Sequence, residues 1–297
     1  MPVFRGSAVA IVTPFHEKDE SLNFDAFADI IDYQIENGTD AIVVCGSTGE
    51  AATMTEEEHM QTVKFCIDHV RHRVPVIAGT GSNCTRTAIH LSKQAAEDGA
   101  DALLLVSPYY NKGTQQGLYL HYRAVADAVN GCPLLIYNVP SRSGVNVLPE
   151  TVARLVRDVP NIVGSKEASG NISQIAKLMA LTDGKIELYS GNDDQVVPLL
   201  ALGGLGVISV VANIAPRAMH EMCARFFAGD VAGAAKIQRD TFPLFENLFS
   251  EVNPIPVKAA MAAMGFCADI VRAPLTPMED EHREVLYRLM HEKGLIL

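Results

Sequence analysis

PLLIYNVP (residues 133–140) and NIVGSKE (residues 161–167) are two short apolar runs separated by a segment with a helical pattern. Six further runs share their form: each is rich in aliphatic residues, has Gly, Ser, Asn or Pro at or near its end, and precedes a helical pattern. They are AVAIVTP (8–14), DAIVVCG (40–46), PVIAGTG (75–81), DALLLVSP (101–108), IELYSGND (186–193) and GVISVVAN (206–213). Continuously apolar strands that alternate with helices are typical of a parallel sheet covered on both faces. Eight such units predict an α/β fold, a closed (β/α)8 or TIM barrel, in preference to an open doubly wound sheet.

The alternation of strands and helices ends near Gly229, and the sequence after it shows helical patterns only. We therefore predict a barrel that carries the active site over residues 1–228 and a C-terminal helical domain over residues 229–297. The helices of this extension are expected at about 230–250, 254–264 and 279–293.

The composition is that of a folded acidic protein. The chain has 24 Lys and Arg against 35 Asp and Glu, a formal net charge of −11, and 48% hydrophobic residues. This supports a large core, and the lack of a Lys/Arg cluster argues against nucleic-acid binding. The uncharged stretch 196–216 is interrupted by Pro198 and three glycines, so no membrane segment is predicted. Six scattered cysteines and a start without a signal-peptide core predict reduced thiols and a cytoplasmic location.

Two side chains at strand ends suggest covalent chemistry. The active site of such a barrel lies at the C-terminal ends of its strands, where Lys166 follows an apolar run. A desolvated lysine loses its proton readily and can attack a carbonyl to form an imine. The alternative is a structural ion pair, for example with Glu167, and position alone favours neither reading. Tyr137 ends the preceding strand, where its phenol could transfer protons, although a packed core tyrosine is the commoner case.

The loop at residues 46–50, GSTGE, combines flexible backbone with the hydroxyls of Ser47 and Thr48. Its N–H groups could bind a small carboxylate and its hydroxyls could extend a proton relay, whereas an ordinary tight turn is the alternative. His69 and His72 lie on a predicted helix outside the barrel, and no histidine ends a strand, so no catalytic metal is predicted. Nicotinamide, phosphate-loop and GxSxG fingerprints are absent, which predicts a reaction without a cofactor.

Motifs spread over the whole chain resemble the 4-hydroxy-tetrahydrodipicolinate synthase (dihydrodipicolinate synthase) family of pyruvate-dependent class I aldolases and lyases. The motifs are AIVTPF, CGSTGEAATM, VIAGTGSN, SPYYNKGTQQGLYLHY, IYNVPSRSG, VGSKEASGN, YSGNDD, GVISVVAN and NPIPVKAAM. The resemblance implies condensation of pyruvate with L-aspartate-4-semialdehyde in the diaminopimelate route to lysine. It implies neither a cofactor nor a metal.

The resemblance also implies roles for individual residues. Lys166 corresponds to the lysine that forms the Schiff base with pyruvate, and Tyr137 to the catalytic proton shuttle. Thr48 corresponds to the relay partner of that tyrosine, and Ser47 beside it retains a hydroxyl where the family usually has threonine. Tyr110 corresponds to a tyrosine that completes the relay from a neighbouring subunit. This implies an obligate homo-oligomer, typically a homotetramer built from two tight dimers.

Three further residues correspond to substrate-binding positions. Arg142 in NVPSR matches the arginine that holds the carboxylate of the semialdehyde, a group that suits its planar fork. Gly191 and Ile208 match positions that line the pocket. The GSTGE form is common in N-acetylneuraminate lyases, which are the nearest alternative together with other 2-keto-acid aldolases, and Arg142 favours the synthase over them. A non-enzyme alternative is a barrel that binds a keto acid as a sensor.

The resemblance also bears on feedback by lysine. Members that lysine inhibits bind it at a subunit interface, at positions that correspond to Asn83, Tyr109 and His59. They carry an acidic residue where this chain has Thr87, so the ammonium group of a bound lysine would lack its carboxylate partner. We therefore expect lysine to inhibit weakly or not at all.

Overall fold

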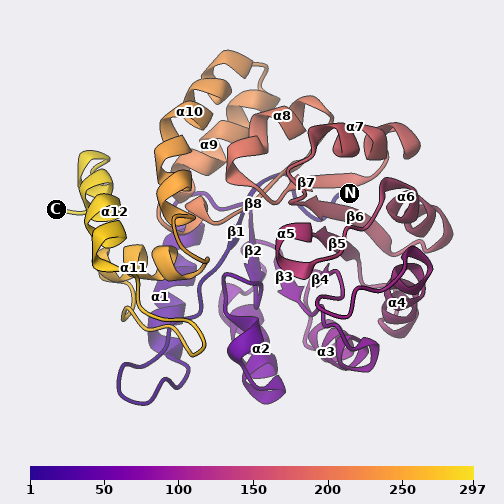
Figure 1. Ribbon diagram of the computed structural model, residues 1–297, viewed down its shortest axis with the longest axis horizontal. Helices are drawn as coiled ribbons and strands as arrows, with labels where there is room; N and C mark the ends of the chain where they lie inside the picture. Colours follow the sequence, from indigo (N-terminus) through magenta and orange to yellow (C-terminus); the bar gives the residue numbers. More distant parts are fainter.

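The computed structural model describes residues 1–297, and its eight parallel strands close into a barrel surrounded by helices (Figure 1). Each strand pairs with the next, and β8 pairs with β1 to complete the closure. The strands are β1 (Gly6–Ala10), β2 (Ala41–Val44), β3 (Val76–Gly79), β4 (Ala102–Val106), β5 (Leu134–Asn138), β6 (Ile162–Glu167), β7 (Glu187–Ser190) and β8 (Gly206–Ser209). The predicted (β/α)8 barrel is confirmed. Strands β2 to β8 lie within their predicted apolar runs, whereas β1 begins at Gly6, before its run of 8–14, and ends at Ala10.

Helices follow the strands and cover the outside of the barrel (Figure 1). They are α1 (Phe24–Glu36), α2 (Glu56–Val70), α3 (Thr85–Glu97), α4 (Gln115–Ala128), α5 (Pro140–Ser143), α6 (Pro149–Asp158), α7 (Ile172–Leu181), α8 (Val196–Ala201) and α9 (Pro216–Phe227). Three single turns of 3-10 helix, η1 (Ala51–Thr53), η2 (Asp193–Gln195) and η3 (Val211–Asn213), lie at the C-terminal ends of β2, β7 and β8. No helix is both long enough and apolar enough to span a lipid bilayer.

The barrel interior is filled by side chains and is not a pore. Small and medium residues of alternate positions, among them Ala8, Val43, Leu104, Leu135 and Ile208, form a separate buried cluster inside the strands. A larger cluster of 59 buried residues lies mainly between the strands and the helices that cover them. Because side chains alternate along a strand, neighbours in register point to the same side of the sheet. The interior thus leaves space only near the ends of the strands.

The C-terminal extension packs against the barrel and reaches its mouth. It contains α10 (Val231–Leu248), α11 (Ile255–Ala263) and α12 (Asp280–Glu292), close to the three predicted helices. Figure 1 shows α10 beside α9, with α11 and α12 on the side of α1. On α11, the fully buried Lys258 pairs with Glu50 of the GSTGE loop at 2.9 Å and donates to the Thr13 carbonyl at 2.7 Å. This buried ion pair holds the extension against a loop at the C-terminal end of β2.

Candidate active site

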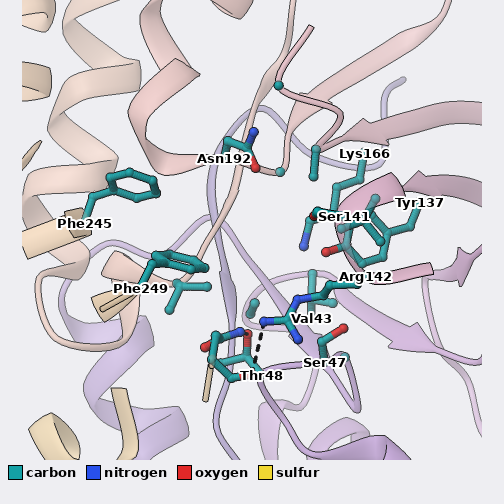
Figure 2. A pocket seen from close by; sticks show the side chains of 18 of the residues that line it. Val43, Ser47, Thr48, Tyr137, Ser141, Arg142, Lys166, Asn192, Phe245 and Phe249 are labelled. Atoms are coloured by element: carbon teal, nitrogen blue, oxygen red, sulfur yellow. Dashed lines mark hydrogen bonds between the residues drawn. The ribbon is translucent and has the colours of Figure 1, made fainter. Parts of the chain in front are cut away.

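A cavity of about 740 Å³ opens at the C-terminal ends of the strands. The residues that line it come from the ends of the strands, from the GSTGE loop, from α5 and from the C-terminal extension. Figure 2 shows Lys166 and Tyr137 together on one side of this cavity, with Phe245 and Phe249 of the extension on the other. The opening of a parallel barrel at this end is where catalytic residues of such folds gather.

Lys166 is the chemically unusual group of the cavity. Its side chain is 6% exposed, and its Nζ lies 4.3 Å from the centre of the Tyr137 ring, the residue beside it in strand register. Burial lowers the pKa of the amine to about 7, with Asp193 acting in the opposite direction and Arg142 lowering it further. The uncharged amine, which is the form that attacks a carbonyl, is therefore available near neutral pH.

Asp193 provides the negative charge that opposes this shift. Its side chain is 4% exposed, and its Oδ2 accepts hydrogen bonds from the backbone N–H groups of Val210 at 2.9 Å and Val211 at 3.1 Å. Burial raises the pKa of this carboxyl, while the donors at the end of β8 and the charge of Lys166 lower it. A carboxylate held this way favours a cation on the Lys166 nitrogen, including a protonated imine.

Gly191 gives the lysine its space. It lies directly after β7, and a Cβ at this position would come within 3.0 Å of the Lys166 Cε and 2.8 Å of the Ala168 Cβ. Any side chain at residue 191 would therefore displace the amine from its position. The glycine acts through the room that it leaves beside Lys166.

Tyr137 is the candidate proton donor. Its side chain is buried, and burial raises the pKa of its phenol, while Arg142 and a hydrogen bond with Ser47 lower it. The phenol is thus protonated at neutral pH and lies against the amine. A phenol next to the reacting nitrogen can give a proton to a leaving hydroxyl and take one back later.

Thr48 and Arg142 meet at a residue of the extension. The Thr48 hydroxyl is buried and accepts a hydrogen bond from the Nδ2 of Asn253 at 3.0 Å. Arg142 is exposed on the short helix α5, where its Nη2 donates to the backbone carbonyl of Asn253 at 3.1 Å. Figure 2 shows its guanidinium extending over the cavity between Thr48 and Tyr137. A planar cation at this rim suits a carboxylate that enters from solvent.

The structure brings most of the predicted site residues together but not all of them. Six of them line the same cavity: Ser47, Thr48, Tyr137, Arg142, Lys166 and Gly191. Ile208 does not line it, because its side chain is 1% exposed and packs into the barrel interior. Tyr110 lies in the loop after β4 with its side chain 88% exposed and its φ at 71°, away from the cavity of its own chain.

Sequence reasoning missed the share of the cavity that the C-terminal extension supplies. Phe245 of α10, Phe249 directly after that helix and Asn253 all line the cavity. The Phe245 and Phe249 rings lie at a tilt to each other, with 5.1 Å between ring centres. The NPIPVKAAM motif begins at Asn253 and was a signal for this segment, but no chemistry could be read from it. The cavity therefore draws on both of the predicted domains.

One group of side chains has the composition of a metal site. Glu251, Glu279 and His282 place their ligand atoms within 4.8 Å of one another at the edge of the extension. Hydrogen bonding explains this arrangement, because Glu251 accepts from the backbone N–H of Glu279 and lies 2.9 Å from the Nδ1 of His282. His69, predicted not to bind a metal, lies 3.0 Å from Asp32 in an ion-pair geometry.

The comparison with protein families decides the affiliation. A model described as the dihydrodipicolinate synthetase family matches residues 3–293. The chain belongs to this family. The predicted resemblance is confirmed.

Individual relatives cover the chain from end to end. A 4-hydroxy-tetrahydrodipicolinate synthase of Lachnoclostridium phytofermentans is 54% identical over 296 residues, which is 100% of this chain and of that protein. The dihydrodipicolinate synthase structure from Thermotoga maritima aligns with a TM-score of 0.96 at 44% identity, over 99% of this chain and 100% of that one. The chloride-inhibited dihydrodipicolinate synthase from Acinetobacter baumannii, solved with pyruvate, aligns with a TM-score of 0.95 at 46% identity, over 98% and 99%.

Proposed function

We propose that this member of the dihydrodipicolinate synthetase family is a lyase that condenses pyruvate with L-aspartate-4-semialdehyde to 4-hydroxy-tetrahydrodipicolinate. The observation that carries the proposal is the buried amine of Lys166, with a pKa of about 7, against the phenol of Tyr137. The full-length identity to curated 4-hydroxy-tetrahydrodipicolinate synthases supports it. We assign the reaction to the diaminopimelate route of lysine biosynthesis, and we propose a cytoplasmic location.

The first half of the reaction forms an enamine. The neutral Nζ of Lys166 adds to C2 of pyruvate, and the carbonyl oxygen becomes a hydroxyl as a proton moves to it from the nitrogen. Tyr137 donates its proton to that hydroxyl, which leaves as water and gives a protonated imine. The Asp193 carboxylate favours this cation. The Tyr137 phenolate then removes a proton from C3, so that the electron pair of the C–H bond moves to form the enamine.

The second half forms one carbon–carbon bond and one carbon–nitrogen bond. The enamine carbon attacks the aldehyde of the semialdehyde, whose oxygen takes the proton from Tyr137, and the imine on Lys166 returns. The amino group of the bound semialdehyde adds to the carbon of the protonated imine, and one of its protons moves to the Lys166 nitrogen, which leaves as the neutral amine while the ring closes. The proton that remains on the ring imine returns to the Tyr137 phenolate. We propose that Arg142, which lines the cavity, pairs with the carboxylate of the semialdehyde through its fork of N–H groups.

Turnover of both substrates tests this function. With pyruvate and L-aspartate-4-semialdehyde, we expect steady turnover, and with N-acetylneuraminate we expect cleavage slower by at least about a hundredfold. Borohydride added with pyruvate should leave one reduced pyruvyl group on the protein. Faster cleavage of N-acetylneuraminate would favour the lyase instead. Tight pyruvate binding without a borohydride adduct would favour the sensor.

The pH dependence of imine formation follows from the depressed pKa of Lys166. We expect the rate constant for pyruvate adduct formation to be flat above about pH 7 and to fall about tenfold per unit below it. The rate falls at low pH because only the uncharged amine of Lys166 attacks pyruvate, and protonation lowers the fraction of uncharged amine as the pH falls. Rapid-quench trapping with borohydride from about pH 5 to about pH 10 measures this. A rate that keeps rising up to the ordinary lysine value near 10.4 would contradict a desolvated amine.

The assembly belongs to the same proposal. We propose a homotetramer built from two tight dimers, in which Tyr110 reaches the relay of the neighbouring subunit. In support, Tyr110 is exposed in a left-handed conformation, with its N–H bonded to the Ser143 carbonyl at 3.2 Å. An aromatic side chain held outward by its own backbone suits a contact with a second copy of the chain.

Weak feedback by lysine is the remaining part of the proposal. Thr87 is half-buried on α3 and offers no negative charge to a lysine ammonium. In a coupled turnover assay we expect sub-millimolar lysine to lower the rate by less than about twofold. Thr87→Glu, which restores a carboxylate, should increase the sensitivity. Strong inhibition of the unsubstituted protein at these concentrations would contradict the expectation.

A further inference from the structure

Asn253 joins two parts of the cavity that lie far apart in the sequence. It lies between α10 and α11, is 5% exposed, and lines the cavity. Its side-chain Nδ2 donates to the Thr48 Oγ1 at 3.0 Å, and its backbone carbonyl accepts from the Arg142 Nη2 at 3.1 Å. The two contacts use different atoms, one of the side chain and one of the backbone. A substitution at this position therefore changes one contact and retains the other.

The contact with Thr48 has a direction. A hydroxyl carries one proton and two acceptor positions. Because the Asn253 Nδ2–H occupies an acceptor position, the proton of Thr48 must point away from Asn253. Within the chain, the bond from Asn253 is the only hydrogen bond of this hydroxyl, so its proton has no acceptor in the same chain. Thr48 thus presents its proton to the cavity, where the relay is proposed to form.

We propose that Asn253 is a positioning residue that makes the Thr48 hydroxyl a proton donor toward the cavity. The proposal rests on the proposed function, in which Thr48 extends the relay of Tyr137. A free threonine hydroxyl rotates and can donate in several directions. With its orientation set in advance, it can supply a proton at the reacting atoms without a search among rotamers.

The segment that carries Asn253 is rigid enough for this role. On the same segment, Lys258 pairs with Glu50 at 2.9 Å, and Glu50 lies two residues after Thr48 in the GSTGE loop. The second oxygen of Glu50 accepts from the backbone N–H of Arg272 at 3.0 Å. The loop and the extension are thus joined by the buried Lys258 pair as well as by Asn253. Because this ion pair joins the two segments, the Asn253 amide and the Thr48 hydroxyl keep a fixed position relative to each other.

Aspartate at residue 253 would reverse the direction of the bond. An ionised carboxylate only accepts, so the Thr48 proton would turn toward it and leave the cavity. The Oδ1 of Asn253 is buried without a partner, so a carboxylate here would also be poorly solvated and would take up a proton readily. Once protonated, the introduced carboxyl group would again have a donor for Thr48. The variant should therefore regain activity, relative to the unsubstituted protein, as the pH falls.

The test compares Asn253→Leu and Asn253→Asp in two-substrate kinetics. We expect Asn253→Leu, which keeps the branched shape of the side chain and removes the donor, to lower kcat about 10- to 100-fold. KM for the semialdehyde should stay within about twofold, because the carbonyl that holds Arg142 remains. For Asn253→Asp, the ratio of its kcat to that of the unsubstituted protein should rise at least about fivefold from about pH 9 to about pH 6. Asn247→Leu, whose amide bonds only the Pro243 carbonyl of its own helix, is the matched control.

A double-mutant cycle with Thr48→Val completes the test. If Asn253 acts through Thr48, Asn253→Leu should have almost no further effect in the Thr48→Val background. Full additivity, an unchanged kcat in Asn253→Leu, or a raised KM for the semialdehyde without a change in kcat would each overturn the proposal. If the leucine variant does not fold, the pH ratio of the isosteric aspartate variant decides. If the unsubstituted protein forms a pyruvate adduct, its covalent function holds, and any of these outcomes counts against the role of Asn253 alone. If it forms no adduct, the proposed function itself fails.

Discussion

Lys166→Ala is expected to lower kcat by about 10⁴-fold or more and to abolish the borohydride adduct with pyruvate. The amine is the nucleophile that converts a ketone into an imine, and the cavity holds no second lysine that could replace it. Lys258 is also buried, but its Nζ is bonded to Glu50 and to the Thr13 carbonyl, and it does not line the cavity. Burial of a lysine is therefore not sufficient for it to react with pyruvate, and we expect the adduct at Lys166 only.

Peptide mapping after reduction measures this directly, because the mass of one reduced pyruvyl group should appear on the peptide that contains Lys166. Lys177→Ala is the matched control, since Lys177 is an exposed lysine that pairs with Glu150 on the outer helices. This control should keep both turnover and adduct. An adduct that persists in Lys166→Ala, or turnover within about tenfold of the unsubstituted protein, would refute the covalent mechanism.

Tyr137→Phe is expected to lower kcat by about 10²- to 10⁴-fold, the range that a positioned acid–base group contributes. The substitution retains the ring that packs against Lys166 and removes only the hydroxyl. Pyruvate should still form an adduct, but more slowly, because the carbinolamine would lose water without its proton donor. Single-turnover trapping with borohydride separates this step from the later carbon–carbon bond formation.

Tyr119→Phe is the control for this substitution. The Tyr119 hydroxyl bonds to Asp158 between α4 and α6, outside the barrel, so its removal should leave kcat within about twofold. If Tyr137→Phe behaved like this control, the phenol would be a packing residue and protons would have to come from another group. If both variants unfold at the same temperature as the unsubstituted protein, a difference in kcat between them reflects the catalytic step and not a loss of folded protein.

Much of the architecture could be predicted from local pattern. Each apolar run is long enough to make a buried strand and is followed by a helix, and eight repeats of this unit close a barrel. The barrel rule then selected Lys166 and Tyr137, because all strands of a parallel barrel end at the same mouth. Their register confirms that the two residues are direct neighbours. For Tyr110 and the assembly, the role across an interface stays a prediction.

The amino-acid sequence by itself determined the barrel, the family and the residue types at the strand ends, because these depend on periodicity and on short motifs. Only the tertiary structure decided that the Lys166 amine is buried, that Ile208 packs into the barrel interior, and that Asn253 contacts Thr48. The physical reason is that burial and hydrogen bonding between distant segments depend on how the whole chain packs. A pKa of about 7 at Lys166 is likewise a property of its surroundings, which several strands and a C-terminal segment supply together.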